Sequence, residues 1–419
     1  MLFALLLVQI FIPKFLCNSE ISFSDNNDGL VSVAVIFRHG DRTPVSPYPN
    51  DPYRNASYWP VGFGQLTNRG KMQHFQLGQW LRERYRNFLP TQYSEKDIYV
   101  RSTDVDRTLM SAEANLAGLF PPQGNQIWNE NLTWQPIPIH TTSEQDDNIL
   151  AMKMPCDKYD FLLSKLLKSK TFLNINKKNH DLYAYLSLYS GTAIKNLETL
   201  EYLYNTLTIE SIYNLTLPNW TYSVFPNKMK PWAELSFAVS CYTKDLARLK
   251  AGPLFNDILK HFANSTHHKS RKFFMYSGHD TTIANILNTL DAFEYHSPPY
   301  AATILFELRA LNGSYFVNIL YKNTTVPQKI ILKECPFYCP LEKFVKLLEP
   351  IRLSPDQWKI ECEMKFLGII PFSTLQNTVF ISCTVLLFLL LGSIFISIIC
   401  TKIRSDSKQD YLRLPNEDI

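Results

Sequence analysis

The sequence predicts an α/β fold followed by one membrane-spanning helix close to the C-terminus. Two observations predict it. Three short apolar runs, at residues 31–37, 98–100 and 273–276, each end in charged residues or histidine, and the second and third lead into helical patterns. A separate run, residues 378–400, contains 23 residues without a charge, and a bilayer core needs about 20.

Composition limits the class of protein. The chain has 419 residues, of which 46% are hydrophobic and 19% are charged, so it is long enough for one large globular domain or two ordinary ones. The formal net charge is only +4, and no long basic run occurs. Nucleic-acid binding is therefore not expected.

Residues 1–17 are predicted to be a signal peptide. Their apolar run, residues 2–12, is short for a membrane span but has the length of a signal-peptide core. Cleavage is expected near Cys17, so that the mature chain would begin at residue 18. The alternative is a buried N-terminal helix.

The C-terminal apolar run predicts the topology. Three basic residues between positions 402 and 408 follow it directly, and such residues favour the cytoplasmic side of a membrane. We therefore expect a lumenal or extracellular domain over residues 18–377, a transmembrane helix over 378–400 and a cytoplasmic tail over 401–419. The alternative is a helix in the core of a soluble domain.

The tail contains a candidate sorting signal. Its sequence YLRL, Tyr411 to Leu414, resembles the YxxΦ signals that clathrin adaptors read. Such a signal predicts a protein that cycles through the plasma membrane and concentrates in the membranes of lysosomes or endosomes. The alternatives are a plain polar tail and residence at the plasma membrane.

Cysteines and glycosylation sequons agree with a lumenal domain. Eight cysteines occur, and five lie outside the predicted signal peptide and span, so at least one is unpaired or bonds to another chain. Seven N-x-S/T sequons predict N-glycosylation, and all of them lie within residues 18–377. Their asparagines are Asn55, Asn131, Asn214, Asn219, Asn264, Asn312 and Asn323.

The first apolar run, residues 31–37, predicts a strand that is covered on both faces of its sheet. It consists mostly of valine, isoleucine and phenylalanine, with little polar alternation. Arg38, His39 and Arg42 follow its end. A helix is expected to begin after Thr67, because this side chain can cap the first backbone N–H groups.

The second and third runs repeat this arrangement. Residues 98–100 predict a short strand with Arg101 at its end, and residues 273–276 predict a strand followed by His279 and Asp280. Apolar residues at helical spacing follow both. In open α/β sheets, ligands bind in the crevice beyond the carboxyl ends of the strands. The charged side chains of all three segments are therefore expected near one site.

These residue types together favour chemistry on phosphate. Arginine clusters recognise phosphate oxygens, a histidine can attack phosphorus, and an aspartate can carry a proton. The alternatives are that each arginine is a solvated surface residue and that Asp280 only caps a helix. No HExxH motif or pair of CxxC motifs occurs, so neither a metal nor another cofactor is expected.

RHGDRTP, residues 38–44, together with SGHDTT, residues 277–282, resembles the histidine acid phosphatases, in the branch of the lysosomal and prostatic acid phosphatases. The resemblance extends over roughly residues 31–365 and includes STDVDRTLMSAEANLAGLFPP. It implies a phosphoglycerate mutase-like core, in which a mixed sheet carries helices on both faces. It also implies a smaller, mostly helical cap inserted at roughly residues 150–250.

The resemblance also implies how the site works. His39 would be the nucleophile that takes the phosphoryl group, and Asp280 would protonate the leaving alcohol. The phosphate-binding residues would be Arg38, Arg42, Arg101 and His279. The expected substrates are small-molecule phosphate monoesters, hydrolysed at acidic pH because Asp280 must first carry a proton.

Other functions stay open. They are a sugar-phosphate mutase of the phosphoglycerate mutase branch, a surface ecto-phosphatase specialised for nucleotides or lysophospholipids, and a catalytically minor receptor on the same scaffold. The predicted signal peptide and the sequons argue against a cytosolic mutase. The presence of both His39 and Asp280 argues against a receptor. The oligomeric state is open, and a homodimer is possible.

Two disulfides are implied by the resemblance, Cys156–Cys362 and Cys335–Cys339. A third bridge of the family is expected to be lost, because Thr303 stands where the family has a cysteine. Cys241 would then have no partner.

Overall fold

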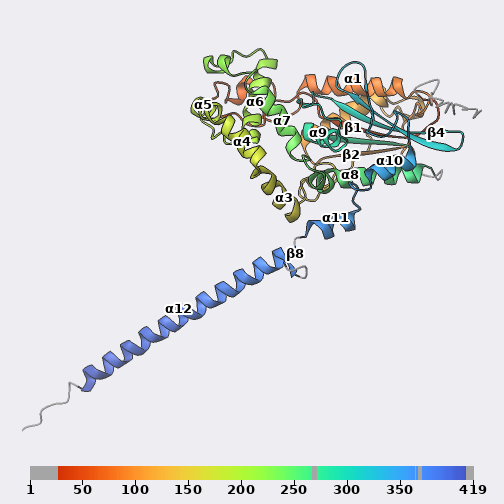
Figure 1. The fold of residues 1–419 in the computed structure, drawn as a ribbon. Helices are drawn as coiled ribbons and strands as arrows, with labels where there is room; N and C mark the ends of the chain where they lie inside the picture. The colour runs from red at the N-terminus through yellow and green to blue at the C-terminus, as the bar shows by residue number, and fades with distance from the viewer. Residues whose placement is uncertain (1–26, 267–270, 364, 367–369, 412–419) are drawn as a thin grey trace, which may run out of the picture.

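The computed structural model describes residues 27–266, 271–363, 365–366 and 370–411 (Figure 1). The predicted signal peptide and Leu414 lie outside these residues. The described chain forms a layered α/β domain, a group of smaller helices at one side of it, and one long C-terminal helix that extends away from both (Figure 1).

One mixed sheet forms the centre of the domain. Its strand order is β2–β3–β1–β4–β5–β6, with β7 paired to β5. β2, β3 and β1 run parallel, and every other pair is antiparallel. The bounds are β1 (Leu30–Arg38), β2 (Ile98–Ser102), β3 (Phe273–Gly278), β4 (Thr303–Leu311), β5 (Ser314–Lys322), β6 (Gln328–Ile330) and β7 (Cys339–Pro340).

The three parallel strands end level with one another. Phe37 of β1 pairs with Ser277 of β3, and Ser102 of β2 pairs with the same Ser277. The next pair along β1 and β3 is Arg38 with Gly278. The residues that follow these strands therefore leave the sheet at one edge, in agreement with the prediction that they share a crevice.

Helices cover both faces of the sheet, as predicted. On β1, Val33, Val35 and Phe37 point to one face, where they pack with α1 and α2. Ala34 and Ile36 point to the other face, where they pack with α8, α9 and α10. Both strand faces are apolar because both are covered. The helices are α1 (Asn68–Arg84), α2 (Asp106–Leu119), α8 (Lys244–Ser265), α9 (Asp280–Thr289) and α10 (Leu341–Leu348).

A group of helices lies between α2 and α8, and its last three share a core of their own, whereas its first packs against α8. Buried leucines such as Leu200 and Leu207 fill this core, and Tyr48 joins it from the segment between β1 and α1. The last helix of the group ends at Val239. The next helix, α8, packs on the sheet. The helices are α3 (Asp157–Leu167), α4 (Lys170–Lys178), α5 (His180–Ser190), α6 (Leu197–Ile212) and α7 (Lys230–Val239). We call this group the cap.

Both disulfides that the resemblance implies are present. Cys156–Cys362 connects the start of α3 to α11 (Pro355–Cys362) over a sequence separation of 206 residues. Cys335–Cys339 closes a short loop before α10. Cys241 is buried and forms no disulfide with another cysteine of the described residues.

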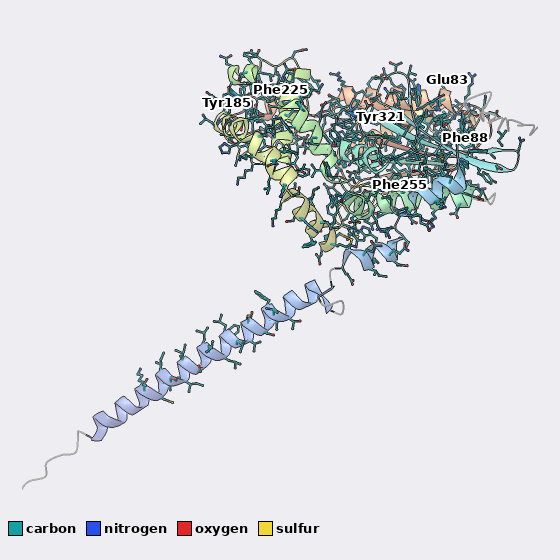
Figure 2. All side chains as sticks on the ribbon, in the orientation of Figure 1. Glu83, Phe88, Tyr185, Phe225, Phe255 and Tyr321 are labelled. Atoms are coloured by element: carbon teal, nitrogen blue, oxygen red, sulfur yellow. A yellow bond between two sulfur atoms is a disulfide. The ribbon has the colours of Figure 1, made fainter. Side chains whose placement is uncertain are left out.

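The C-terminal helix α12 (Phe372–Tyr411) extends away from the domain (Figure 1). Among the described residues, one helical segment, Thr378–Lys402, is long enough and apolar enough to cross a membrane. The most apolar stretch of this segment has no buried residues. Its side chains stand clear of the domain on all sides (Figure 2). The predicted C-terminal apolar helix is therefore confirmed. A short hairpin, β8 (Lys365–Phe366) and β9 (Ile370–Pro371), precedes it.

The sequon asparagines lie at the surface of the domain. Six of the seven are exposed, and Asn323 is half-buried. This placement agrees with their predicted modification.

Candidate active site

His39 lies directly after β1, where the parallel strands end. Its ring is 1% exposed, and Nδ1 lies 2.8 Å from the carbonyl oxygen of Gly40. A carbonyl only accepts hydrogen bonds, so Nδ1 carries the proton and the neutral ring keeps its lone pair on Nε2. Burial lowers the pKa of His39 well below its usual value, and the charges of Arg38 and Arg107 lower it further. His39 is therefore a neutral imidazole even at acidic pH.

The segment after β1 is held against the start of α1. A Cβ atom on Gly40 would overlap the backbone of Gly70, so only glycine fits this close approach. Thr67 Oγ1 donates to Asp41 Oδ2 at 2.6 Å, and the Tyr213 hydroxyl donates to the same oxygen at 2.7 Å. The predicted cap by Thr67 is present, because its side chain also accepts from the backbone N–H of Gly70. These contacts fix the position of His39.

Arg42 and Arg107 line a cavity together with His39. Arg42 donates from Nη2 to Asn205 Oδ1 of α6 at 3.2 Å. Arg107 lies in the first turn of α2, just after β2 ends. Burial and the charge of Arg42 lower the pKa of Arg107 to about 10, so it stays a cation at acidic and neutral pH. Two positive charges thus face the cavity beside the imidazole.

Arg38 joins the same site through Asp280. Its Nη2 lies 2.9 Å from Asp280 Oδ2, and the side chains are 6% and 15% exposed. The guanidinium also donates to the Pro298 carbonyl and lies 4.3 Å from the ring centre of Tyr300. Burial by itself would raise the pKa of Asp280, but the charges of Arg38 and Arg42 outweigh it and lower the pKa. Asp280 is therefore ionised while the cavity holds no phosphate.

His279 lies beside His39 at the end of β3, with 5.6 Å between the ring centres. Its backbone N–H donates to Thr282 Oγ1 in the first turn of α9 at 3.2 Å, and its Nε2 lies 3.0 Å from Thr103 Oγ1. Burial and the charge of Arg107 lower the pKa of His279. The ring is thus neutral, and its place between β3 and α9 is fixed from both sides.

The structure corrects the prediction for Arg101. Arg101 lies within β2, and its Nη2 donates to Oδ1 of the fully buried Asp147 at 2.9 Å. It is absent from the residues that line the cavity around His39. Side chains alternate along a strand, so Arg101 lies on the same face of the sheet as Tyr99, which packs with α8. It does not lie beyond the end of the strand, where the crevice is. Arg107 occupies the position that was predicted for Arg101.

The cavity around His39 has a volume of about 530 Å³ and lies between the sheet edge and the cap. Sequence reasoning gave no role to four of the charged, histidine and amide side chains in its wall. Two of them, Glu201 and Asn205, come from the cap helix α6, whose placement no local motif reveals. The charged, histidine and amide side chains that line the cavity are His39, Arg42, Arg107, Lys153, Glu201, Asn205, His279 and Asp280.

The arrangement suits transfer of a phosphoryl group. A neutral imidazole nitrogen faces a space bordered by guanidinium groups, and a carboxyl group stands beside it. Cations stabilise the charge on the phosphoryl oxygens, and the carboxyl group can carry a proton. Within the part of the chain that the structure describes, no three histidine, cysteine, aspartate or glutamate side chains converge as a metal site requires.

Comparison with known proteins identifies the family. The model of the histidine phosphatase superfamily, branch 2, matches residues 29–238 and 228–322. The chain belongs to this superfamily. The family that the two sequence motifs indicated is therefore confirmed, together with its mixed sheet and flanking helices.

Individual relatives of this histidine phosphatase agree. Rat (Rattus norvegicus) prostatic acid phosphatase is 44% identical over 339 residues, which are 79% of this chain and 88% of the relative. Human (Homo sapiens) lysosomal acid phosphatase is 39% identical over 79% of this chain and 80% of its own. A phytase from Citrobacter braakii shares the fold, with a TM-score of 0.59 and 18% identity over 80% of this chain and all of the phytase.

Proposed function

We propose that this acid phosphatase hydrolyses phosphate monoesters through a phosphohistidine formed at His39. The enzyme class follows from its family and from relatives that are acid phosphatases. The observation that carries the proposed mechanism is the state of His39. Its Nδ1 donates a hydrogen bond to the Gly40 carbonyl oxygen. Its Nε2 is therefore the free nucleophilic nitrogen, in a cavity lined by arginines.

In the first step, Nε2 of His39 attacks phosphorus and the bond to the ester oxygen breaks. The guanidinium groups of Arg38, Arg42 and Arg107 stabilise the charge on the phosphoryl oxygens. Asp280 gives its proton to the departing alcohol, which alkyl esters need because an alkoxide is a poor leaving group. In the second step, Asp280 takes a proton from water as the water oxygen attacks phosphorus and releases His39.

The acidic pH optimum follows from the ion pair of Asp280 with Arg38. In the free enzyme this pair keeps Asp280 ionised. A bound phosphate competes for Arg38 and adds negative charge beside Asp280, and both effects raise the pKa of the carboxyl group. Acidic conditions then supply the proton that Asp280 donates, while His39 stays neutral because its own pKa is low.

Replacement of His39 by alanine tests the proposal. The variant should lose turnover of every phosphate monoester, and acid-quenched labelling with radioactive phosphate should mark His39 in the wild-type enzyme only. Substantial remaining turnover in His39→Ala, with the fold intact by circular dichroism, would show that the phosphoryl group is carried elsewhere or nowhere.

We also propose that the enzyme works in the membrane of lysosomes or endosomes. The apolar helix Thr378–Lys402 would be the anchor, with basic residues and the tail on the cytoplasmic side. The exposed sequon asparagines and the two disulfides suit a lumenal domain. Tyr411, at the end of α12, and Leu414 would be read by a clathrin adaptor. The second candidate, an ecto-phosphatase at the plasma membrane, requires that this signal is not used.

A further inference from the structure

The cap helix α6 presents a carboxyl group to the catalytic cavity. Asn205 of this helix accepts a hydrogen bond from Arg42 at 3.2 Å, which fixes the face of α6 that is turned to the sheet. Glu201 lies four residues earlier, so it stands on the same face one turn away. It lines the cavity together with His39 and Asp280.

Glu201 also stands at the entrance to a second, more apolar cavity. This annex has a volume of about 230 Å³ and is bordered by Leu163, Leu167 and Phe172 of the cap. The two cavities share four wall residues, Glu201, Tyr202, Phe237 and Thr281. A leaving group that extends from the phosphate past Asp280 toward the annex would therefore pass the carboxyl group of Glu201.

Glu201 has no hydrogen-bond or ion-pair partner of its own among the described residues, although arginines are close. Burial raises the pKa of Glu201 to about 8, and the negative charge of Asp280 contributes, against the opposing charges of Arg42 and Arg38. The other charged or titratable groups around it come from every side of the cavity and from its own helix. They are His39, Arg107, Lys153, His279 and Glu198.

We propose that Glu201 is a specificity-determining residue that reads the charge of the leaving group. It favours phosphate monoesters of amino alcohols, whose leaving group carries an ammonium group near the ester oxygen, over esters whose leaving group carries a second anion. This proposal rests on the proposed function, because it assumes that the ester is cleaved at His39 in the same cavity.

The physical reason is that the arginines are already engaged when a phosphate is bound. The phosphoryl oxygens occupy Arg38, Arg42 and Arg107, so the carboxyl group of Glu201 remains the unpaired ionisable group on the side of the leaving group. An ammonium group would form a charge-assisted hydrogen bond with it, and the rings of Tyr202 and Phe237 at the same boundary attract cations. A second anion would meet an ionising carboxyl group there, which costs free energy.

The pH dependence of specificity distinguishes this role from a structural one. At about pH 5 Glu201 is protonated and can only offer a neutral hydrogen bond, so leaving groups of different charge should differ little. As the pH approaches 8, Glu201 ionises. The preference for an ammonium group should therefore rise with pH, and tolerance of a second anion should fall.

The experiment uses three substrates of similar size on the purified full-length enzyme in detergent. They are 2-aminoethyl phosphate, propyl phosphate and carboxymethyl phosphate, which carry a cation, no charge and an anion on the leaving group. In the wild-type enzyme, the ratio of kcat/KM for 2-aminoethyl phosphate to that for propyl phosphate should rise about tenfold between pH 5 and pH 8. The ratio of kcat/KM for carboxymethyl phosphate to that for propyl phosphate should fall over the same pH interval.

Glu201→Gln keeps the shape of the protonated acid but cannot ionise, so both ratios should keep only the pH dependence that comes from ionisation of the substrates. Dividing wild-type ratios by those of Glu201→Gln cancels the ionisation of the substrates themselves. Glu198→Gln is the matched control, because Glu198 lies one turn away on α6, is exposed and lines only the annex. It should behave as the wild type does.

A wild-type ratio that does not change with pH, or a Glu201→Gln variant that follows the wild type, would overturn the proposal and leave the phosphatase mechanism intact. A change of equal size in Glu198→Gln would also overturn it, because the effect would then be a general property of charge on α6. Failure of the mechanism itself would appear differently, as turnover of all three substrates by His39→Ala.

Discussion

Replacing Glu210 by glutamine should remove a large part of the pH dependence of stability. Glu210 lies near the end of α6, is fully buried and faces Asp51 of the segment between β1 and α1. Within the described chain, neither carboxyl oxygen of Glu210 meets a donor group, and Oδ2 of Asp51 and the hydroxyl group of Tyr48 also have no partner. A proton held between the two carboxyl groups satisfies both, and two ionised carboxylates would repel each other across the contact between the cap and this segment.

The magnitude follows from the shift in pKa. Burial and the adjacent Asp51 raise the pKa of Glu210 from 4.5 to about 8. The folded state therefore binds this proton more tightly than the unfolded state, so the stabilisation is complete below about pH 4.5 and is lost as the pH rises toward 8. Between pH 5 and pH 7 the free energy of unfolding should fall by roughly 2–3 kcal/mol from this group alone, at about 1.4 kcal/mol per pH unit.

Thermal unfolding of the wild-type enzyme and Glu210→Gln, followed by calorimetry from pH 5 to pH 8, measures this difference. Glutamine keeps the shape of the protonated acid and can donate to Asp51, so the variant should be about as stable as the wild type at pH 5 and more stable at pH 7.5. Glu198→Gln, on the exposed face of the same helix, should leave the wild-type profile unchanged. Parallel profiles for the wild type and Glu210→Gln would refute the reasoning.

Three further outcomes are expected. Asp280→Asn should slow hydrolysis of alkyl phosphates by roughly 10²–10⁴-fold and that of p-nitrophenyl phosphate far less, because nitrophenolate leaves without a proton; equal losses in steady-state kinetics would remove Asp280 from this role. Arg107→Ala should weaken inhibition by inorganic phosphate with little change in melting temperature. Arg101→Ala should instead lower the melting temperature, because it leaves Asp147 buried without its ion pair. The opposite pattern would restore Arg101 as the phosphate ligand. Tyr411→Ala should raise the fraction of the enzyme at the cell surface and slow the uptake of antibody bound to its lumenal domain. Unchanged uptake would favour an enzyme that resides at the plasma membrane.

Local sequence patterns were sufficient to predict the parallel strands and the residues at their ends. Each strand is a short apolar run, and the pattern of β1 in particular requires cover on both faces, which α1 and α2 on one side and α8 and α9 on the other provide. His39, His279 and Asp280 follow strand ends without an intervening element, so the topology of the sheet brings them together.

The same reasoning failed for Arg101 because strand ends are uncertain by one or two residues. The expected strand stopped at residue 100, whereas β2 continues to Ser102, and this keeps Arg101 inside the alternation of the strand. Arg107 lies in the first turn of a helix that follows a parallel strand. The first turn of such a helix lies as close to the ligand crevice as a strand end does. The sequence shows this position, because Arg107 directly precedes the apolar residues of α2.

The contribution of the cap could not be predicted, because it depends on which face of α6 meets the sheet. On the sequence, Glu201, Asn205 and Glu210 are three of several polar residues in α6, and such residues are usually solvated. In the structure, Asn205 accepts from Arg42 and Glu201 lines the cavity. Glu210 lies nine residues after Glu201, on about the opposite side of the helix, and meets Asp51. No motif marks this contact, since it joins segments about 160 residues apart in the chain.

α6 therefore adapts the enzyme to acid in a way that is separate from the chemistry of Asp280. Its carboxyl groups Glu201, which is half-buried, and Glu210, which is fully buried, both have a pKa raised to about 8. Both are therefore neutral in an acidic compartment, and both begin to ionise near neutral pH. One faces the leaving group and the other faces the contact of the cap with the Tyr48–Asp51 segment. Loss of activity at neutral pH would then combine three causes: an unprotonated Asp280, a changed charge beside the leaving group and a weaker cap contact. The glutamine variants separate them, because Glu201→Gln should alter the ratios between substrates, whereas Glu210→Gln should alter thermal stability and leave those ratios as they are.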